Sequence, residues 1–225
     1  MAELRPPLII VNFKAYREVE GSSALAIARD CEAVAKSSGV SVMACPPMVE
    51  LSLVAKAVSI PVMTQHVDAR SPGSATGWVT PEMALAAGAV GTLVNHSEHR
   101  LPDKDIASIV SSCKRIGLRT CVCADTASNT GRFAELRPDM VAVEPPELIG
   151  GDVSVTDARP EIVSEAVESA RRIDASIPVL CGAGVKTGKD VKRALELGAK
   201  GVLLASGVVK SKDPRKALED LVRFI

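Results

Sequence analysis

Aromatic side chains and net charge are both scarce in this sequence of 225 residues. It contains one Trp, one Tyr and three Phe, and its 27 Lys and Arg balance its 27 Asp and Glu. Proteins that bind nucleic acids generally present a cationic surface with aromatic platforms for the bases. A chain without net charge is also not drawn to an anionic membrane. We therefore expect neither a nucleic acid nor a membrane as a partner.

Long apolar runs are also missing. The first run, Leu8-Ile9-Ile10-Val11, is too short for the hydrophobic region of a signal peptide. No other run reaches the roughly 18 residues that a membrane span requires. From this pattern we expect a soluble, cytoplasmic protein.

The six cysteines do not show the spacing of a metal or redox site. They lie within or beside apolar runs, and the pair Cys121-x-Cys123 does not have the separation of zinc ligands or of a redox pair. We expect buried, reduced thiols, and neither a metal ion nor another cofactor.

Short apolar segments alternate with helical patterns eight times along the chain. Parallel strands that are covered on both faces typically have such continuous apolar runs. The predicted strands are Leu8–Val11, Val40–Ala44, Ile60–Met63, Ala89–Val94, Leu118–Val122, Met140–Val143, Ile177–Cys181 and Gly201–Leu204. Between them, apolar residues recur with the helical period, as in Ile106, Ile109, Val110 and Cys113, or in Leu218, Leu221, Val222 and Ile225.

Helix start and stop signals agree with this division. Thr187 and Asp190 have the spacing of a capping box, and Asp213 lies at a predicted helix start. Gly39 and Gly117 follow helical stretches, where a C-terminal glycine belongs. No linker or block of charge divides the chain, so residues 1–225 are predicted to form one domain.

Eight units of about 28 residues each favour a closed (β/α)8 barrel. The alternative is an open, doubly wound sheet, which typically has fewer strands and a glycine fingerprint in its first turn. The first turn here, Asn12-Phe13-Lys14-Ala15-Tyr16, contains no glycine. The predicted fold is therefore an α/β barrel.

A carboxylate follows the sixth predicted strand. Glu144 comes directly after Met140–Val143 and before Pro145 and Pro146, which stiffen the loop as it leaves the strand. Gly150 and Gly151 end the loop, so it has the rigid entry and glycine exit of a hinged lid. Considered alone, this stretch fits an ordinary strand-to-helix connection equally well.

Other strand ends also present reactive or small residues. Asn12 and Lys14 follow the first strand, and His96 follows the fourth. Gly182-Ala183-Gly184 and Ala205-Ser206-Gly207 follow the seventh and eighth, where barrel enzymes commonly bind phosphate. Taken alone, each of these residues or segments could have a purely structural role. Because all of these strand ends meet at one mouth of a barrel, together they indicate an active site.

Three of these segments resemble triosephosphate isomerases, in the right order and over nearly the whole chain. Val11-Asn12-Phe13-Lys14 resembles the Asn-x-Lys segment of the family, Val94-Asn95-His96-Ser97-Glu98 its His-Ser-Glu segment, and Val143-Glu144-Pro145 its Glu-Pro segment. The stretches 91–98 and 144–150 are especially similar to the short archaeal form.

The resemblance implies an aldose–ketose isomerase that uses no cofactor and interconverts two triose phosphates in glycolysis and gluconeogenesis. It implies that Glu144 is the base, His96 the electrophile, Lys14 the cation beside the developing oxyanion and Asn12 a polar contact near it. Glu98 resembles a partner of Lys14. The implied substrate contacts are Asn12, Lys14, Ile149, Gly150, Gly184, Ala205, Ser206 and Gly207.

The sequence departs from the family pattern around the phosphate. Gly150-Gly151-Asp152 stands where members often have Gly-Thr-Gly, and Gly182-Ala183-Gly184 lacks a common serine. Two alternatives stay open, namely a metal-dependent sugar-phosphate epimerase and a barrel that binds a sugar phosphate without catalysis. Thr76-Gly77 resembles the loop tip that contacts a neighbouring subunit, and the archaeal similarity favours a homotetramer over a dimer. Trp78 is either an interface aromatic or the filling of this loop.

Overall fold

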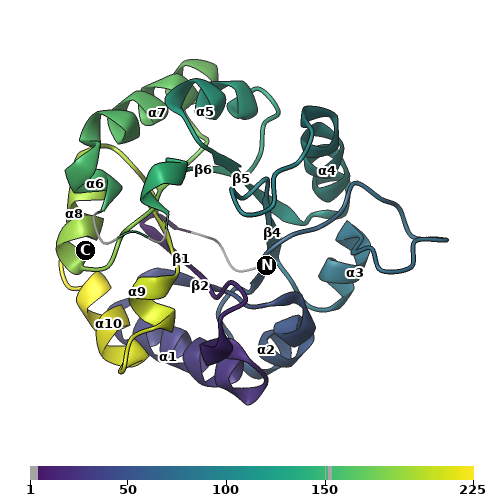
Figure 1. Ribbon diagram of the computed structural model, residues 1–225, viewed down its shortest axis with the longest axis horizontal. Helices are drawn as coiled ribbons and strands as arrows, with labels where there is room; N and C mark the ends of the chain where they lie inside the picture. The colour runs from purple at the N-terminus through teal and green to yellow at the C-terminus, as the bar shows by residue number, and fades with distance from the viewer. Residues whose placement is uncertain (1–4, 150, 152–153) are drawn as a thin grey trace.

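The structure, a computed structural model, describes residues 5–149, 151 and 154–225. Its strands form one parallel, barrel-like sheet that is surrounded by helices (Figure 1). In the described residues the strands are β1 (Leu8–Asn12), β2 (Ser41–Cys45), β3 (Met63–Thr64), β4 (Gly91–Val94), β5 (Arg119–Ala124), β6 (Met140–Val143), β7 (Val179–Cys181) and β8 (Gly201–Leu204).

The barrel is nearly closed, with one weak seam. The strand order is β2-β1-β8-β7-β6-β5-β4-β3, so the first and last strands of the chain are neighbours. Among the described residues, the end strands β2 and β3 are joined by a single bridge from Ala44 to Val62, where the Ala44 N–H donates to the Pro61 carbonyl over 3.2 Å. The predicted eight-stranded α/β barrel is therefore confirmed. It is not fully closed, however, because no regular strand pairing joins β2 and β3 at this seam in the described residues.

The third strand was predicted too early. Strands β6 and β8 have the predicted bounds, but β3 covers Met63–Thr64 instead of Ile60–Met63. Pro61 has no N–H to donate to a strand ladder, so regular pairing begins after it. The buried Thr64, whose hydroxyl donates to the His66 carbonyl over 3.2 Å, was missed because the prediction searched for apolar residues.

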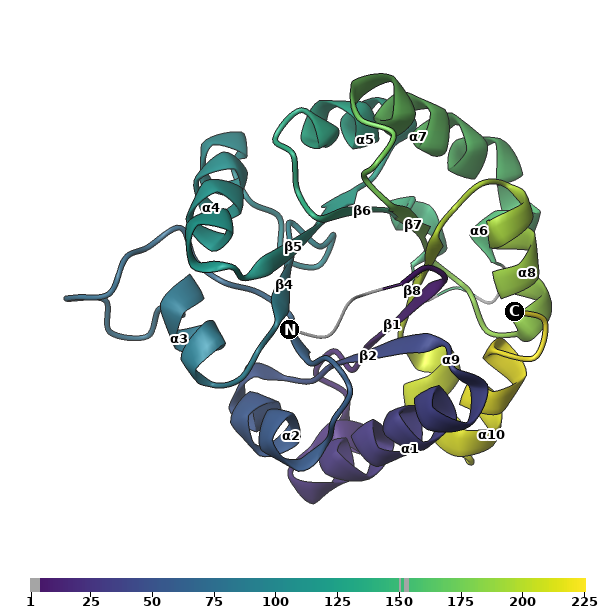
Figure 2. The same cartoon turned by 180° about the vertical axis from the view of Figure 1, so that it is seen from behind.

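Helices surround the sheet on its outer side (Figures 1 and 2). They are α1 (Ser22–Ser38), α2 (Leu51–Ala57), α3 (Pro81–Ala86), α4 (Asp103–Ile116), α5 (Ala127–Ala134), α6 (Val155–Ala158), α7 (Pro160–Ile173), α8 (Gly188–Glu196), α9 (Ser206–Val209) and α10 (Pro214–Leu221). Short 3-10 turns cover Arg17–Val19, Met48–Glu50 and Pro146–Leu148. None of the helices in the described part of the chain is long and apolar enough to cross a bilayer.

The predicted helix signals are present in the structure. Thr187 and Asp190 form a reciprocal capping box at the start of α8, and the Asp213 carboxylate accepts from the Lys216 N–H at the start of α10. Gly39 and Gly117 end α1 and α4 in left-handed conformations. The prediction that Ile225 belongs to the apolar face of the last helix was wrong, because α10 ends at Leu221 and Ile225 is 42% exposed.

The apolar strands are buried on both faces. Along β1, Leu8 and Ile10 join the cluster inside the barrel, whereas Ile9 and Val11 join the larger cluster between the sheet and the helices. This alternation follows from the two-residue period of a strand. It explains why a continuous apolar run, and not an alternating one, marks these strands.

All six cysteines are free and buried, as the sequence predicted. Burial raises the pKa of each thiol, for example that of Cys113 to about 12. The thiols therefore stay protonated near neutral pH and behave as small apolar core residues.

An arm between β3 and α3 projects from the body of the protein (Figures 1 and 2). Asp68 closes its base, because its N–H donates to the Val79 carbonyl and its carboxylate accepts from the Val79 N–H, each over 2.7 Å. Trp78, which precedes Val79, is 45% exposed, and the Arg70 guanidinium lies over its ring at 4.5 Å.

The close contact between the start of β8 and β1 can be tested by mutation. Gly201 has φ +155°, and a Cβ there would lie 2.0 Å from the Leu8 carbonyl oxygen. We predict that Gly201→Ala lowers the free energy of unfolding by more than about 3 kcal/mol or prevents folding, because the rigid β1–β8 pairing must separate. Gly39→Ala is the control. Its φ is +76° and it has no heavy atom near the added Cβ, so its cost is only about 1–2 kcal/mol. If urea unfolding showed equal losses of unfolding free energy for the two variants, the proposed clash between a side chain at position 201 and Leu8 would be contradicted.

Candidate active site

A recess opens at the carboxyl end of the sheet. It has about 420 Å³ of space including its open mouth, and residues that follow β1, β4, β6, β7 and β8 line it. The lining residues are Asn12, Lys14, Tyr16, His96, Glu144, Gly151, Ala183, Gly184, Val185, Leu203, Leu204, Ala205 and Ser206. The four predicted catalytic residues come from three distant segments of the sequence and lie around one space.

Glu144 is a buried acid at the end of β6. Its side chain is 7% exposed, and its Oε2 atom has no hydrogen-bond partner among the described residues. Burial raises the pKa of this carboxyl to about 7, although Lys14 and a hydrogen bond with the Cys123 thiol act in the opposite direction. A carboxylate with this pKa is a far stronger base than an ordinary glutamate and can still lose its proton near neutral pH.

The closest approach to Glu144 comes from the chain after β7. A Cβ on Gly182 would lie 2.5 Å from the Leu203 carbonyl oxygen and 2.9 Å from Oε1 of Glu144. Only glycine therefore fits here without displacing the carboxylate or the neighbouring strand.

His96 lies opposite Glu144, with 3.6 Å between its Nε2 and Oε2 of the acid. The imidazole is buried, and its Nδ1 accepts a hydrogen bond from the Glu98 N–H over 3.2 Å. Burial is the main reason that the pKa of His96 falls to about 4, and Lys14 and Arg100 lower it further. The ring is therefore neutral at pH 7. Because Nδ1 is an acceptor, the proton is on Nε2, which faces Glu144.

Lys14 supplies the positive charge. Its Nζ lies 2.7 Å from Oε1 of Glu98, and its side chain is only 11% exposed. The backbone of Lys14 has φ +52°, which is uncommon for any residue except glycine, and its N–H donates to Oδ1 of Asn12 over 3.0 Å. Asn12 thus holds the turn, and the predicted contact between Lys14 and Glu98 is present.

Two residues that hold the site were missed in the sequence. Gln65, the single glutamine of the chain, donates from Nε2 to the carbonyl of Lys14 over 2.9 Å and to that of Cys45 over 3.1 Å. Asn95 has φ +61°, and its side chain contacts Cys123 and Leu101. The one signal that the two residues share in the sequence is their position just after a strand. For Asn95 there is a second signal, because asparagine tolerates positive φ better than most residues.

Only some of the residues predicted to contact the phosphate line the recess. Gly184, Ala205 and Ser206 line the recess, and so does Gly151. Gly207 lies against the loop after β7, where an added Cβ would be 3.1 Å from the Lys186 Cα and from the Val185 carbonyl oxygen. Ile149 does not line the recess either, and Gly150 and Asp152 lie outside the described residues. The contacts of Ile149, Gly150 and Gly207 stay predictions.

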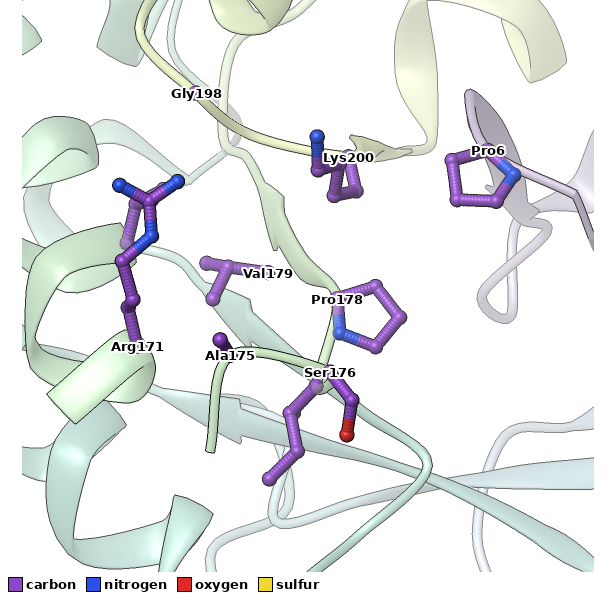
Figure 3. A pocket seen from close by; sticks show the side chains of 10 residues that line it. Pro6, Arg171, Ala175, Ser176, Pro178, Val179, Gly198 and Lys200 are labelled. Carbon is purple, nitrogen blue, oxygen red and sulfur yellow. The ribbon is translucent and has the colours of Figure 1, made fainter. Parts of the chain in front are cut away.

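A second pocket lies at the opposite end of the sheet (Figure 3). It has about 510 Å³ of space, and its lining includes Pro6, Arg171, Pro178, Val179 and Lys200. Except for Arg171, which lies in α7, these residues precede or begin strands, whereas catalytic groups in α/β barrels follow them. We therefore place the candidate active site in the recess around Glu144.

The recess contains the groups for proton transfer next to a carbonyl. Glu144 can remove a proton from carbon, while the Nε2–H of His96 and the Lys14 ammonium can face an oxygen that becomes negative. Within residues 5–149, 151 and 154–225, no group of three or more His, Cys, Asp or Glu is arranged to hold a metal ion.

Comparison with known proteins identifies relatives along nearly the whole chain. Residues 7–225 match the sequence profile of the triosephosphate isomerase family. Triosephosphate isomerase of Methanosarcina acetivorans is 45% identical over 219 residues, which cover 97% of this chain and 99% of that protein. The enzymes so named from Methanocaldococcus jannaschii and Methanothermus fervidus are each 45% identical. Their alignments cover 97% and 96% of this chain, and 100% and 97% of the relatives.

The buried carboxyl gives a prediction about pH. Because the pKa of Glu144 rises from 4.5 to about 7 on folding, the folded protein holds this proton more tightly than the unfolded chain. This group therefore lowers the free energy of unfolding as pH increases from about 4.5 to about 7, and adds nothing further above that range. Glu144→Gln cannot ionise and should not show this decline.

The measurement is the difference in urea stability between wild type and Glu144→Gln at several pH values. Comparing the two proteins cancels the contribution of His96, whose lowered pKa acts in the opposite direction over pH 4–6.5. A difference that is constant between pH 4.5 and 7, or a Glu144 titration by NMR with a midpoint near 4.5, would contradict the desolvation of this carboxyl.

Proposed function

The chain belongs to the triosephosphate isomerase family, and from this premise we propose that it interconverts dihydroxyacetone phosphate and D-glyceraldehyde 3-phosphate. The observation that carries the proposal is the convergence of Lys14, His96 and Glu144 on one recess. The reaction moves a proton between two neighbouring carbons through an enediolate. The three groups supply what this requires, namely a base, a neutral hydrogen-bond donor and a positive charge.

Glu144 is the proposed base. The proton next to a carbonyl is weakly acidic, so the carboxylate must be more basic than one in water. Burial supplies this basicity, because it raises the pKa to about 7. The unpartnered Oε2 atom is free to receive the proton from one carbon and return it to the next.

His96 and Lys14 are the proposed stabilisers of negative charge on the two oxygens of the enediolate. A neutral imidazole donor beside a glutamate base is a known property of this family of enzymes. Here the low pKa of His96 and the hydrogen bond to its Nδ1 provide that state before substrate arrives. Fixed donors in a site from which water is excluded stabilise the transition state without reorganising during the reaction.

The phosphate is proposed to bind on the side of the recess formed by Gly184, Ala205 and Ser206. At Gly184 and Ala205 the contacts would come from backbone N–H groups, which approach an anion closely where side chains are small. Ile149, Gly150 and Gly207 belong to the same proposed set. Holding the phosphate also keeps the enediolate from expelling it.

We further propose a cytoplasmic enzyme of glycolysis and gluconeogenesis that uses no cofactor. Its 225 residues form one domain, whose barrel is closed across the seam between β2 and β3. The arm that carries Thr76 and Gly77 is proposed to contact a neighbouring copy, in a homotetramer rather than a dimer. The exposed Trp78 beside this tip supports an oligomer contact.

Replacement of the base tests the assignment. We predict that Glu144→Gln lowers kcat in a coupled assay with glyceraldehyde 3-phosphate by at least about 10³-fold. The affinity for a phosphate ligand should stay within about tenfold of wild type, because the carboxylate acts in the chemical step.

Treatment of the wild type with EDTA is the parallel experiment and should leave kcat unchanged. Unchanged turnover in the variant would remove Glu144 from its role, and EDTA-sensitive activity restored by a divalent metal would favour the epimerase.

Assembly has a separate test. Sedimentation of the wild type should give four times the mass of the 23.5 kDa chain. A charge at the tip, Thr76→Glu, should shift the protein toward smaller species, because this segment enters the neighbour. The matched control is Ser164→Glu, which adds the same charge at an exposed position on α7, outside the arm. A monomer for the wild type, or no difference between the variants, would contradict the proposed contact.

A further inference from the structure

One lysine outside the proposed catalytic set contacts a residue that lines the recess. The Nζ of Lys210 lies 4.2 Å from the centre of the Tyr16 ring, and Tyr16 lines the recess. Lys210 also ends α9, whose first residue, Ser206, lines the same recess. Lys210 follows α9 directly, so its backbone lies about 6 Å along the helix axis from Ser206, and a phosphate beside Ser206 would lie on the order of 10 Å from the ammonium.

The charge of Lys210 is not neutralised by a neighbour. In the part of the chain that the structure describes, no carboxylate pairs with it, and its side chain is exposed. Lys14 differs, because Glu98 lies 2.7 Å from its ammonium. Since the whole chain has no net charge, long-range attraction of an anion depends on local charges, and an unpaired cation adds to it.

The Tyr16 ring gives this cation a fixed place. An exposed lysine normally samples many rotamers in water, but the face of an aromatic ring attracts an ammonium and restricts it. Tyr16 is the only tyrosine of the chain, and it stands in the loop that follows Lys14. The contact therefore holds one positive charge above the entrance to the recess.

We propose that Lys210, seated on Tyr16, guides the phosphate dianion of the substrate into the recess. This inference rests on the proposed function. Lys210 does not touch the reacting carbons, so it is a guiding and positioning residue. By Coulomb's law in water, one charge about 10 Å from a dianion would strengthen binding roughly fourfold without screening, and roughly two- to threefold at about 20 mM salt, where the Debye length is about 20 Å. At about 0.5 M salt, where screening acts over roughly 4 Å, this gain disappears.

The test compares Lys210→Met, Lys210→Arg and Lys56→Met at about 20 mM and 0.5 M NaCl. Lys56 is an exposed lysine in the last turn of α2 and is the matched control. We expect Lys210→Met to lower kcat/KM about two- to threefold at low salt, through KM, and to equal wild type at high salt. Lys210→Arg keeps the charge and should restore the wild-type value, and Lys56→Met should match wild type at both salt concentrations.

Binding of inorganic phosphate, measured by calorimetry at both salt concentrations, keeps the inference separate from the proposed function. Weaker phosphate binding in Lys210→Met at low salt only would support the guiding role even if the wild type had no isomerase activity. Loss of kcat that persists at high salt would assign Lys210 to the structure of the α9 region instead. Equal kcat/KM and equal phosphate binding in all proteins at low salt would overturn the inference.

Discussion

The chemistry proposed for this protein depends on the removal of one carboxylate from water. Glu144 lies at the end of a fully buried strand, between His96 and the chain after β7, and its pKa is raised to about 7. A buried acid costs folding free energy whenever it is ionised. Lys14 and the Cys123 thiol offset part of that cost, because both stabilise the ionised carboxylate.

The backbone around this carboxylate is also held in uncommon conformations. Lys14 and Asn95 both have positive φ values, and each has side-chain hydrogen bonds that fix it. Gln65 adds a link across three strand ends, since it reaches Lys14 and Cys45 from the far side of the weak seam. Local strain of this kind persists where the surroundings determine the conformation, and it is common at functional sites.

Much of this arrangement could be predicted from the sequence, for identifiable physical reasons. Strands such as Met140–Val143 are buried on both faces, so their apolar runs are continuous, and parallel pairing brings the residues that follow them to one mouth. Pro61 and Thr64 shifted the third strand from its predicted position, because one lacks a donor and the other is polar. The role of Gln65 and the pKa of Glu144 depend on atoms from distant segments, which no local pattern contains. Resemblance to a family supplied the roles of His96 and Lys14, which the residues alone left open.

The central claim is that Glu144 exchanges a proton with carbon while His96 and Lys14 stabilise the enediolate. It is tested most directly by incubating the protein with dihydroxyacetone phosphate in D₂O and following the substrate by NMR. The account predicts that one deuteron enters the carbon that carries the free hydroxyl, at one of its two positions, and that the product aldehyde is deuterated next to its carbonyl. Dihydroxyacetone phosphate that stays unlabelled and unconverted, with the phosphate bound, would contradict the account and indicate a barrel that binds sugar phosphates without catalysis.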